Sequence, residues 1–297
     1  MQFSSKKPQF QDLKNKWTAR HRSLQNKLWD KHSQALNWLG KNVPGKQLAI
    51  GSLGGLMLLT TPASTALNNQ QYLNSATIVA QEDQNTLLAK RLKEALPADV
   101  RPLTTIEEDQ IGKILSDSFD FQVLAQLQGK KLNRSYGLIG GEQHLYRYPG
   151  DTLEAHAKNS QDWAMYGSSG IAPGLGAWGY FAHSQQDFTD RDEARERYYI
   201  AVQTFLSPGF AERVAEYRDF FKFRKMLLVN PKTGQSVVTV IGDAGPAQWT
   251  GKHLGGSPEV MEAVGLAKGP RKGPVLYFFI DDPDDKIPLG PLRAKNL

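Results

Sequence analysis

Residues 226–246 read MLLVNPKTGQSVVTVIGDAGP and carry the clearest structural signal in the chain. Two apolar runs rich in β-branched residues flank the segment Asn-Pro-Lys-Thr-Gly, residues 230–234. Such runs favour strands, and a five-residue loop with glycine at the left-handed position joins the strands of a hairpin. The sequence therefore predicts a β-hairpin that turns at Gly234.

The residues after the hairpin predict a strand end, a short helix and a final strand. Residues 242–246, Gly-Asp-Ala-Gly-Pro, stop the second strand, and an Asp between glycines at a strand end lies where a ligand can approach closely. Ser257 suits a helix N-cap, Pro258 the first helical position and Gly265 the helix end. The apolar run at residues 275–280 predicts the final strand.

This order of elements resembles the domains of rare lipoprotein A and of expansin-like proteins. The shared motifs are Asp-x-Gly-Pro, Thr-Gly and a Ser-Pro-capped helix that ends in Gly-Leu. Clear similarity covers residues 223–266 and is most specific over residues 238–266. Upstream, residues 163–167 resemble that family's opening strand, and residues 178–183 resemble a following strand at the groove.

The resemblance implies a C-terminal six-stranded double-psi β-barrel that acts on cell-wall glycan. The barrel domain is expected over residues 151–297, with a helical insertion at about 190–222. In lytic transglycosylases of this family, an Asp in the matching motif acts as acid/base on the glycosidic bond, which carries that role onto Asp243. His183 is the expected catalytic partner in place of the family's His, and His253 and Asp187 are the alternatives. Sugar rings stack on aromatic planes, and the expected substrate-binding residues are Trp249, Trp178, Tyr180, Thr250 and His253.

The sequence departs from the family pattern at two places. The family's His before the hairpin has no counterpart, because residues 202–203 are Val and Gln, and the Asp before the capping Ser is replaced by glycines at residues 255–256. Two alternatives therefore stay open. Asp243 holds the turn by accepting backbone N–H groups, or the module binds the wall without cleaving it, as expansin-like relatives are regarded as doing.

Thiol and metal chemistry find little support in the sequence. The chain has no cysteine, which excludes disulfides, zinc–thiolate sites and cysteine nucleophiles. His183 and Asp187 have the i, i+4 spacing of a ligand pair on a helix, but no third ligand accompanies them. We expect no metal site and no cofactor.

Residues 82–150 predict a small α+β unit ahead of the barrel. A leucine stripe at residues 82–96 predicts a helix that ends before Pro97, and Thr104 with Glu107 forms the capping-box pattern of a second helix. Alternation and turn residues then predict short strands up to about Tyr148. The buried face expected for the second helix is Ile106, Ile111, Ile114 and Leu115.

The formal net charge of +6 resides in the N-terminal tail. Residues 1–46 carry ten Lys and Arg against only two Asp, so the rest of the chain is close to neutral. A nearly neutral globular part lacks the basic footprint that nucleic acid requires, and we exclude that partner. Residues 47–66 are uncharged and largely apolar, which predicts a signal or transmembrane segment, and residues 67–81 a linker. The positive-inside rule keeps the tail cytoplasmic and exports the remainder.

The sequence favours a mainly β envelope protein with α insertions, membrane-anchored or secreted, that binds peptidoglycan or a related polysaccharide. Lytic-transglycosylase-like or glycosidase cleavage through Asp243 is the leading hypothesis, and a non-catalytic expansin-like module is its rival. A third hypothesis is an envelope scaffold whose basic tail binds lipid or a partner. A buried helix at residues 48–59 in a cytosolic protein is the alternative to export.

Overall fold

The computed structural model describes residues 83–295, which lie within one compact unit. The tail, the apolar segment and the linker expected at residues 1–46, 47–66 and 67–81 lie outside this range. Between residues 83 and 295, no helix combines the length and the apolar character needed to cross a bilayer.

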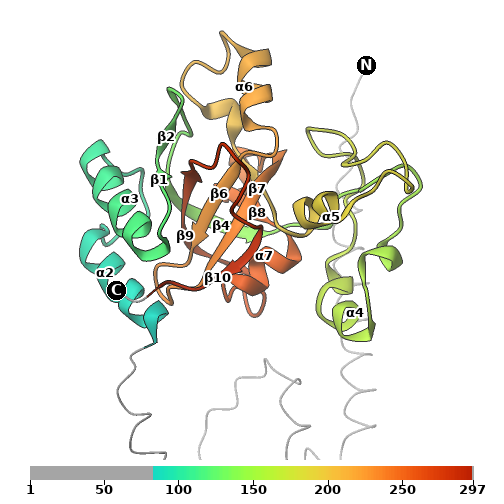
Figure 1. Cartoon of the computed structure of the whole chain (residues 1–297), viewed down its shortest axis with the longest axis horizontal. Coiled ribbons are helices and arrows are strands. Elements are labelled where there is room, and N and C mark those ends of the chain that lie inside the picture. Colours follow the sequence, from blue (N-terminus) through green and yellow to red (C-terminus); the bar gives the residue numbers. More distant parts are fainter. Residues whose placement is uncertain (1–82, 296–297) are drawn as a thin grey trace, which may run out of the picture. The chain divides into compact units, whose positions relative to one another are not determined.

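Six strands close into a mixed β-barrel (Figure 1). They are β4 (Tyr136–Gly141), β5 (Tyr199–Val202), β6 (Lys225–Val229), β7 (Ser236–Ala244), β8 (Leu254–Gly256) and β9 (Lys272–Ile280). Around the barrel the order is β4, β9, β6, β7, β5, β8 and back to β4. The pairs β4–β8 and β5–β7 are parallel and the others antiparallel. Each barrel strand is therefore paired on both sides, which removes free edges from the ring.

Short strands extend the sheet outside the ring. β1 (Val123–Leu124) pairs with β9, and β10 (Gly290–Leu292) pairs with β7. β2 (Gln126–Leu127) and β3 (Lys130–Lys131) form a separate hairpin. Since β10 follows β9, the strand expected at residues 275–280 is present but is not the last strand of the chain.

The β6–β7 hairpin is confirmed. The two strands are antiparallel with Leu227 opposite Val238, and Gly234 has the left-handed φ of 72°. Successive side chains of a strand point to opposite faces, so Met226 and Leu228 pack in the barrel interior while Leu227 packs in a second cluster outside it. Burial of both faces explains why these strands are almost continuously apolar.

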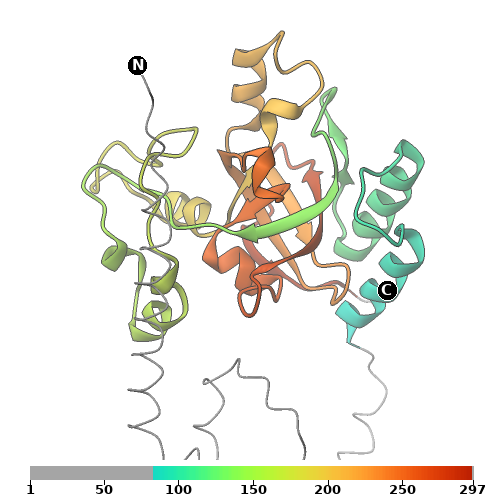
Figure 2. The ribbon, with the colours of Figure 1, turned by 180° about the vertical axis from the view of Figure 1, so that it is seen from behind.

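Two helices cover one outer side of the barrel, and their predicted signals are confirmed. α2 (Gln84–Ala95) and α3 (Thr105–Phe119) lie together there (Figures 1 and 2). The Thr104 side chain accepts the Glu107 N–H, and Glu107 accepts from the Thr104 backbone, a complete capping box. The expected burial of Ile106 is wrong, because this side chain in the first turn is 80% exposed. The buried outer cluster is formed with Leu88, Leu92, Ile111, Leu115 and Phe119.

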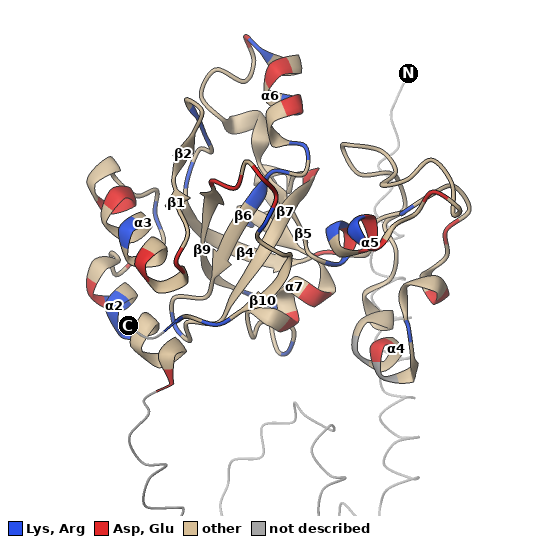
Figure 3. Cartoon of the chain, viewed as in Figure 1, with Lys and Arg blue, Asp and Glu red and all other residues tan. Residues whose placement is uncertain are grey.

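Four further helices lie outside the barrel, and the helix labelled α4 stands in a lobe to one side of it (Figure 1). They are α4 (Ser160–Tyr166), α5 (Asp190–Arg197), α6 (Val214–Phe221) and α7 (Pro258–Ala263), with short 3₁₀ turns η1 (Leu153–His156), η2 (Gly167–Ser169), η3 (Thr204–Leu206) and η4 (Gln248–Thr250). Ser257 caps α7 through the Val260 N–H, Pro258 is its first residue, and Gly265 is left-handed after it, as predicted. Charged residues of both signs gather on α5 and on other helices, whereas the barrel strands carry few (Figure 3).

Two expected strands are absent. Residues 163–167 belong mostly to α4, because Asn159 caps that helix by accepting the Asp162 N–H. Residues 178–183 form a loop, since Gly179 has a φ of 77° and the Phe181 and Ala182 N–H groups both donate to the Arg147 carbonyl instead of to a strand.

The sheet also begins earlier than the expected domain boundary. β4 is a full barrel strand although it precedes residue 151, and β5 lies within residues 190–222, where only a helical insertion was expected. β5 has only four residues, all buried, between two charged helices. So short a run leaves no periodicity that separates a strand from the surrounding helices.

Candidate functional site

The barrel places Asp243 near the C-terminal end of β7. Ala201 of β5 is its partner in the parallel pair, and the Gly245 N–H donates to the Val202 carbonyl over 2.9 Å. A side chain at Gly242 would place its Cβ 2.6 Å from the Cβ of Tyr199. Glycine at this position therefore allows β5 to lie close to β7 and fixes the backbone beneath Asp243.

The Asp243 carboxyl is half-buried and hydrogen-bonded on one side. Oδ1 accepts from the Ala177 N–H over 2.6 Å and from the Ala244 N–H over 2.8 Å. Among residues 83–295, Oδ2 has no hydrogen-bond partner, and it is not one of the fully buried unpaired atoms. Burial raises the pKa of this carboxyl above its ordinary value, and the two backbone bonds only partly offset that rise. Asp243 thus both anchors the 176–178 loop and keeps a free oxygen with increased affinity for a proton.

Trp178 follows Ala177, whose N–H binds this carboxyl, but the Trp178 side chain makes its own contacts within the protein. Its Nε1 donates to the Ile241 carbonyl over 3.1 Å, and the ring packs against the barrel interior. The Arg218 guanidinium lies 5.8 Å from the centre of the ring. The indole is therefore mostly a packing and positioning group, although it is not fully buried.

Trp249 is the most exposed large apolar side chain of the described chain, at 89%. It lies in η4, in the loop that continues from Asp243. The neighbouring Thr250 hydroxyl donates to the Ala247 carbonyl over 2.7 Å and stabilises this turn. The Trp249 indole is therefore almost fully exposed to solvent, on the loop that follows Asp243.

The other expected site residues are more dispersed. His183 and Tyr180 are exposed in the 178–183 loop, and none of the described contacts joins His183 to Asp243. His253 Nδ1 accepts the Leu138 N–H over 2.9 Å. Burial, with the neighbouring cations of Arg134 and Lys272, lowers the pKa of His253. His253 is therefore uncharged near pH 7, and its ring holds the backbone of β4 in place.

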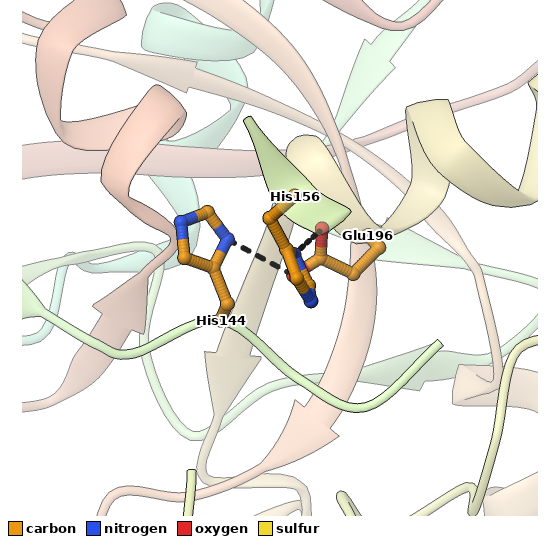
Figure 4. A group of neighbouring side chains, drawn as sticks. All are labelled: His144, His156 and Glu196. Atoms are coloured by element: carbon orange, nitrogen blue, oxygen red, sulfur yellow. Dashed lines mark hydrogen bonds and ion pairs between the residues drawn. The ribbon is translucent and has the colours of Figure 1, made fainter. Parts of the chain in front are cut away.

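The most concentrated group of titratable side chains was not predicted. His144 follows β4, His156 ends η1, and Glu196 lies in the last turn of α5. All three are buried, and their ligand-type atoms lie within 4.8 Å of one another (Figure 4). Glu196 lies in a helix made almost entirely of charged residues, but the packing of α5 turns this side chain inward, where it is 1% exposed.

Further charges surround this group. Asp151 accepts two hydrogen bonds from the Arg147 guanidinium and one contact from His156 Nε2 over 2.9 Å. Burial, with the nearby Glu196 carboxylate, raises the pKa of Glu259 to about 7. In the sequence, the only available signal was the clustering of polar residues at 144, 147, 151 and 156, which has no helical or strand period.

A separate open pocket of about 360 Å³ lies elsewhere on the barrel. Its lining carries charges of both signs from Arg195, Asp219, Lys222, Arg224, Lys225, Asp282 and Asp285, together with Phe223 and Ile280. Asp243 does not line it. The pocket and the candidate acid are therefore distinct features.

Comparisons with known proteins return no relative. No protein-family model matches the chain, and no curated protein or solved structure matches it either. The fold and the geometry of the described residues therefore carry the functional argument.

Proposed function

We propose that this protein is an extracytoplasmic, wall-associated protein whose barrel is of the double-psi type and binds peptidoglycan or a related polysaccharide. Cleavage follows a lytic-transglycosylase-like route with Asp243 as the acid/base. The supporting observation is the half-buried Asp243 carboxyl, with one oxygen held by backbone N–H groups, the other free, and its pKa raised by burial. The mixed six-stranded barrel with two parallel pairs is consistent with the double-psi type.

The raised pKa suits general-acid chemistry. A carboxylic acid that retains its proton nearer neutral pH donates it to the glycosidic oxygen as the C–O bond breaks. The resulting carboxylate then takes a proton from a hydroxyl of the same sugar as that oxygen bonds to the anomeric carbon, which closes an internal ring and returns the acid form. Because Oδ1 is held by Ala177 and Ala244, Oδ2 is the oxygen available for both transfers.

Digestion of purified peptidoglycan by the full chain tests the enzyme. We expect soluble muropeptides from the wild type and a loss of at least about 100-fold with Asp243→Asn, the scale of one general acid/base group. Asp284→Asn is the matched control, since that carboxylate is exposed and pairs with Lys286. If the wild type and Asp243→Asn release equal amounts of muropeptide, Asp243 is not the acid/base of the reaction.

A non-catalytic binding module is the second candidate, and the exposure of Trp249 favours it. A bare indole offers a sugar-stacking plane without any need for an acid. Under this alternative, the full chain sediments with insoluble wall without releasing fragments, and Asp243→Asn leaves sedimentation unchanged. Trp249→Ala then reduces wall binding, whereas Ile106→Ala, which truncates an exposed apolar side chain in the first turn of α3, does not.

A further inference from the structure

We propose that His144, His156 and Glu196 form a binding site for a zinc-type divalent transition-metal ion. The three side chains come from the loop after β4, from η1 and from α5 (Figure 4). They are 1%, 7% and 1% exposed, respectively. Two imidazole nitrogens with one carboxylate are a common ligand set for Zn²⁺ and related ions, whereas Ca²⁺ and Mg²⁺ prefer oxygen ligands.

The separations of the ligand atoms suit such an ion. His144 Nδ1 lies 3.3 Å from Glu196 Oε1, and His156 Nδ1 lies 3.3 Å from Glu196 Oε2. Ligands about 2.1 Å from a tetrahedral ion lie roughly 3.4 Å from one another. The two histidine rings are themselves adjacent, with centroids 4.5 Å apart. One ligand atom from each residue lies within 4.8 Å of the others, so the three side chains must move closer together to surround one ion.

An unpaired nitrogen points to the same position. His156 Nδ1 is fully buried and has no hydrogen-bond partner among residues 83–295. Its 3.3 Å approach to the Glu196 carboxylate counts as an ion-pair contact by distance but lacks hydrogen-bond geometry. A buried polar atom without a partner is costly, and with a proton on Nε2 the neutral ring presents a lone pair at Nδ1 that a metal ion accepts.

The surroundings hold the ligands in place. His156 Nε2 contacts Asp151 Oδ2 at 2.9 Å, the carboxylate–histidine arrangement that commonly fixes a metal-binding imidazole. The Arg147 guanidinium donates to both oxygens of Asp151, from Nε to Oδ2 over 2.9 Å and from Nη2 to Oδ1 over 2.6 Å. On the other ligand, the Leu145 N–H donates to Glu196 Oε1 over 3.0 Å. These contacts orient the imidazole and the carboxylate toward each other.

The local charge is consistent with an added cation. Three carboxylates, of Asp151, Glu196 and Glu259, face two guanidinium groups, of Arg147 and Arg197. A proton on an imidazole, or a metal ion in its place, compensates the buried Glu196 carboxylate. Glu259 Oε2 is itself buried without a hydrogen-bond partner in the described chain.

The ion would stabilise the loop after β4 and, through it, residues 170–182, which contact Asp243. His144 exchanges backbone hydrogen bonds with Gly170 and Ala172, and the Arg147 carbonyl accepts from Phe181 and Ala182. Residues 170–182 include the Ala177 N–H that binds Asp243. We therefore assign the ion a structural role in this loop region, and this role does not depend on what the barrel binds.

Metal uptake by the full chain tests the site. The chain is stripped with a chelator, equilibrated with Zn²⁺ or Co²⁺ and separated from free ion. We expect one Zn²⁺ per chain by elemental analysis, the visible absorption of four- or five-coordinate Co²⁺, and a higher melting temperature with Zn²⁺. No stoichiometric uptake by the wild type would overturn the proposal and leave a histidine proton as the compensating charge.

Substitutions locate the ion. Glu196→Gln keeps the acceptor for the Leu145 N–H but removes the charge, and we expect it to abolish uptake, as does His156→Gln. Asp151→Asn should weaken Zn²⁺ binding by about 10–100-fold, the usual effect of a supporting carboxylate. His183→Gln, which changes an exposed histidine, is the matched control and should bind as the wild type does. Circular dichroism verifies folding, and unchanged uptake by folded Glu196→Gln and His156→Gln would refute this assignment.

Discussion

Replacement of Gly234 by Ala tests how closely α2 is packed against the β6–β7 hairpin. Gly234 has a φ of 72°, and a Cβ on it would lie 2.0 Å from the backbone oxygen of Asn85, in the first turn of α2. A left-handed backbone costs Ala about 1 kcal/mol relative to Gly. The clash is with backbone, so no side-chain rotation relieves it, and such overpacking costs about 1–3 kcal/mol more. We expect the free energy of unfolding to fall by about 2–4 kcal/mol.

The packing of α2 sets an upper limit on that loss. Leu88 and Leu92 of α2 are completely buried against the outer side of the barrel. Full burial of one leucine contributes about 1.5–3 kcal/mol, so detachment of the helix would forfeit about 3–6 kcal/mol. A loss of 2–4 kcal/mol therefore corresponds to a helix that shifts, and a loss near the upper limit to one that detaches.

Gly129→Ala is the matched control. Gly129 has nearly the same φ, 73°, but a Cβ there meets nothing within 4 Å. We expect a loss of about 1 kcal/mol from the backbone alone. Urea unfolding of the full chain, followed by circular dichroism, measures both changes, and hydrogen exchange over residues 84–95 reports the state of α2. Losses that agree within about 0.5 kcal/mol would refute the close approach of helix and hairpin.

Two further predictions concern carboxyl groups. The hydrogen bond from Arg101, with that from the Thr104 backbone, lowers the pKa of Glu107 to about 2. Because the folded pKa is below the ordinary value of 4.5, this contribution to stability is present above pH 4.5 and is lost as the pH falls toward 2; Arg101→Gln should flatten that part of the stability profile. At the candidate acid, a methyl group on Gly176 would lie 3.5 Å from the Asp243 carboxyl carbon and displace solvent. Gly176→Ala should raise the pKa of Asp243 further in a carboxyl-resolved NMR titration, whereas Gly174→Ala, with open space around it, should not; identical titrations would contradict the placement of this loop.

Local sequence signals predicted those elements whose cause is itself local. The hairpin turn needs a residue that tolerates positive φ, and Gly234 supplies it. The capping box of α3 and the Ser-Pro start of α7 are satisfied by residues within three positions of each other. Such signals require no knowledge of the distant chain, which is why they appear in the sequence alone.

Short strands, and segments whose pattern fits both a helix and a strand, were harder to predict. β4 lies in the segment where strands were predicted, but its place in the barrel depends on partners far along the chain. β5 has only four residues, too short a run to show a strand period. Residues 163–167 contain apolar side chains that fit a strand or a helix equally, and the Asn159 cap selects the helix. The loop at residues 178–183 follows from Gly179 and from hydrogen bonds to Arg147.

The sequence by itself determined a β-rich C-terminal half, the position of Asp243 at a strand end, and the absence of thiol chemistry. Only the tertiary structure decided the environment of that carboxyl, because Ala177, which holds it, lies 66 positions away in the chain. The same holds for His144, His156 and Glu196. They have no common period, and burial of α5 against the loop after β4 brings their charges together.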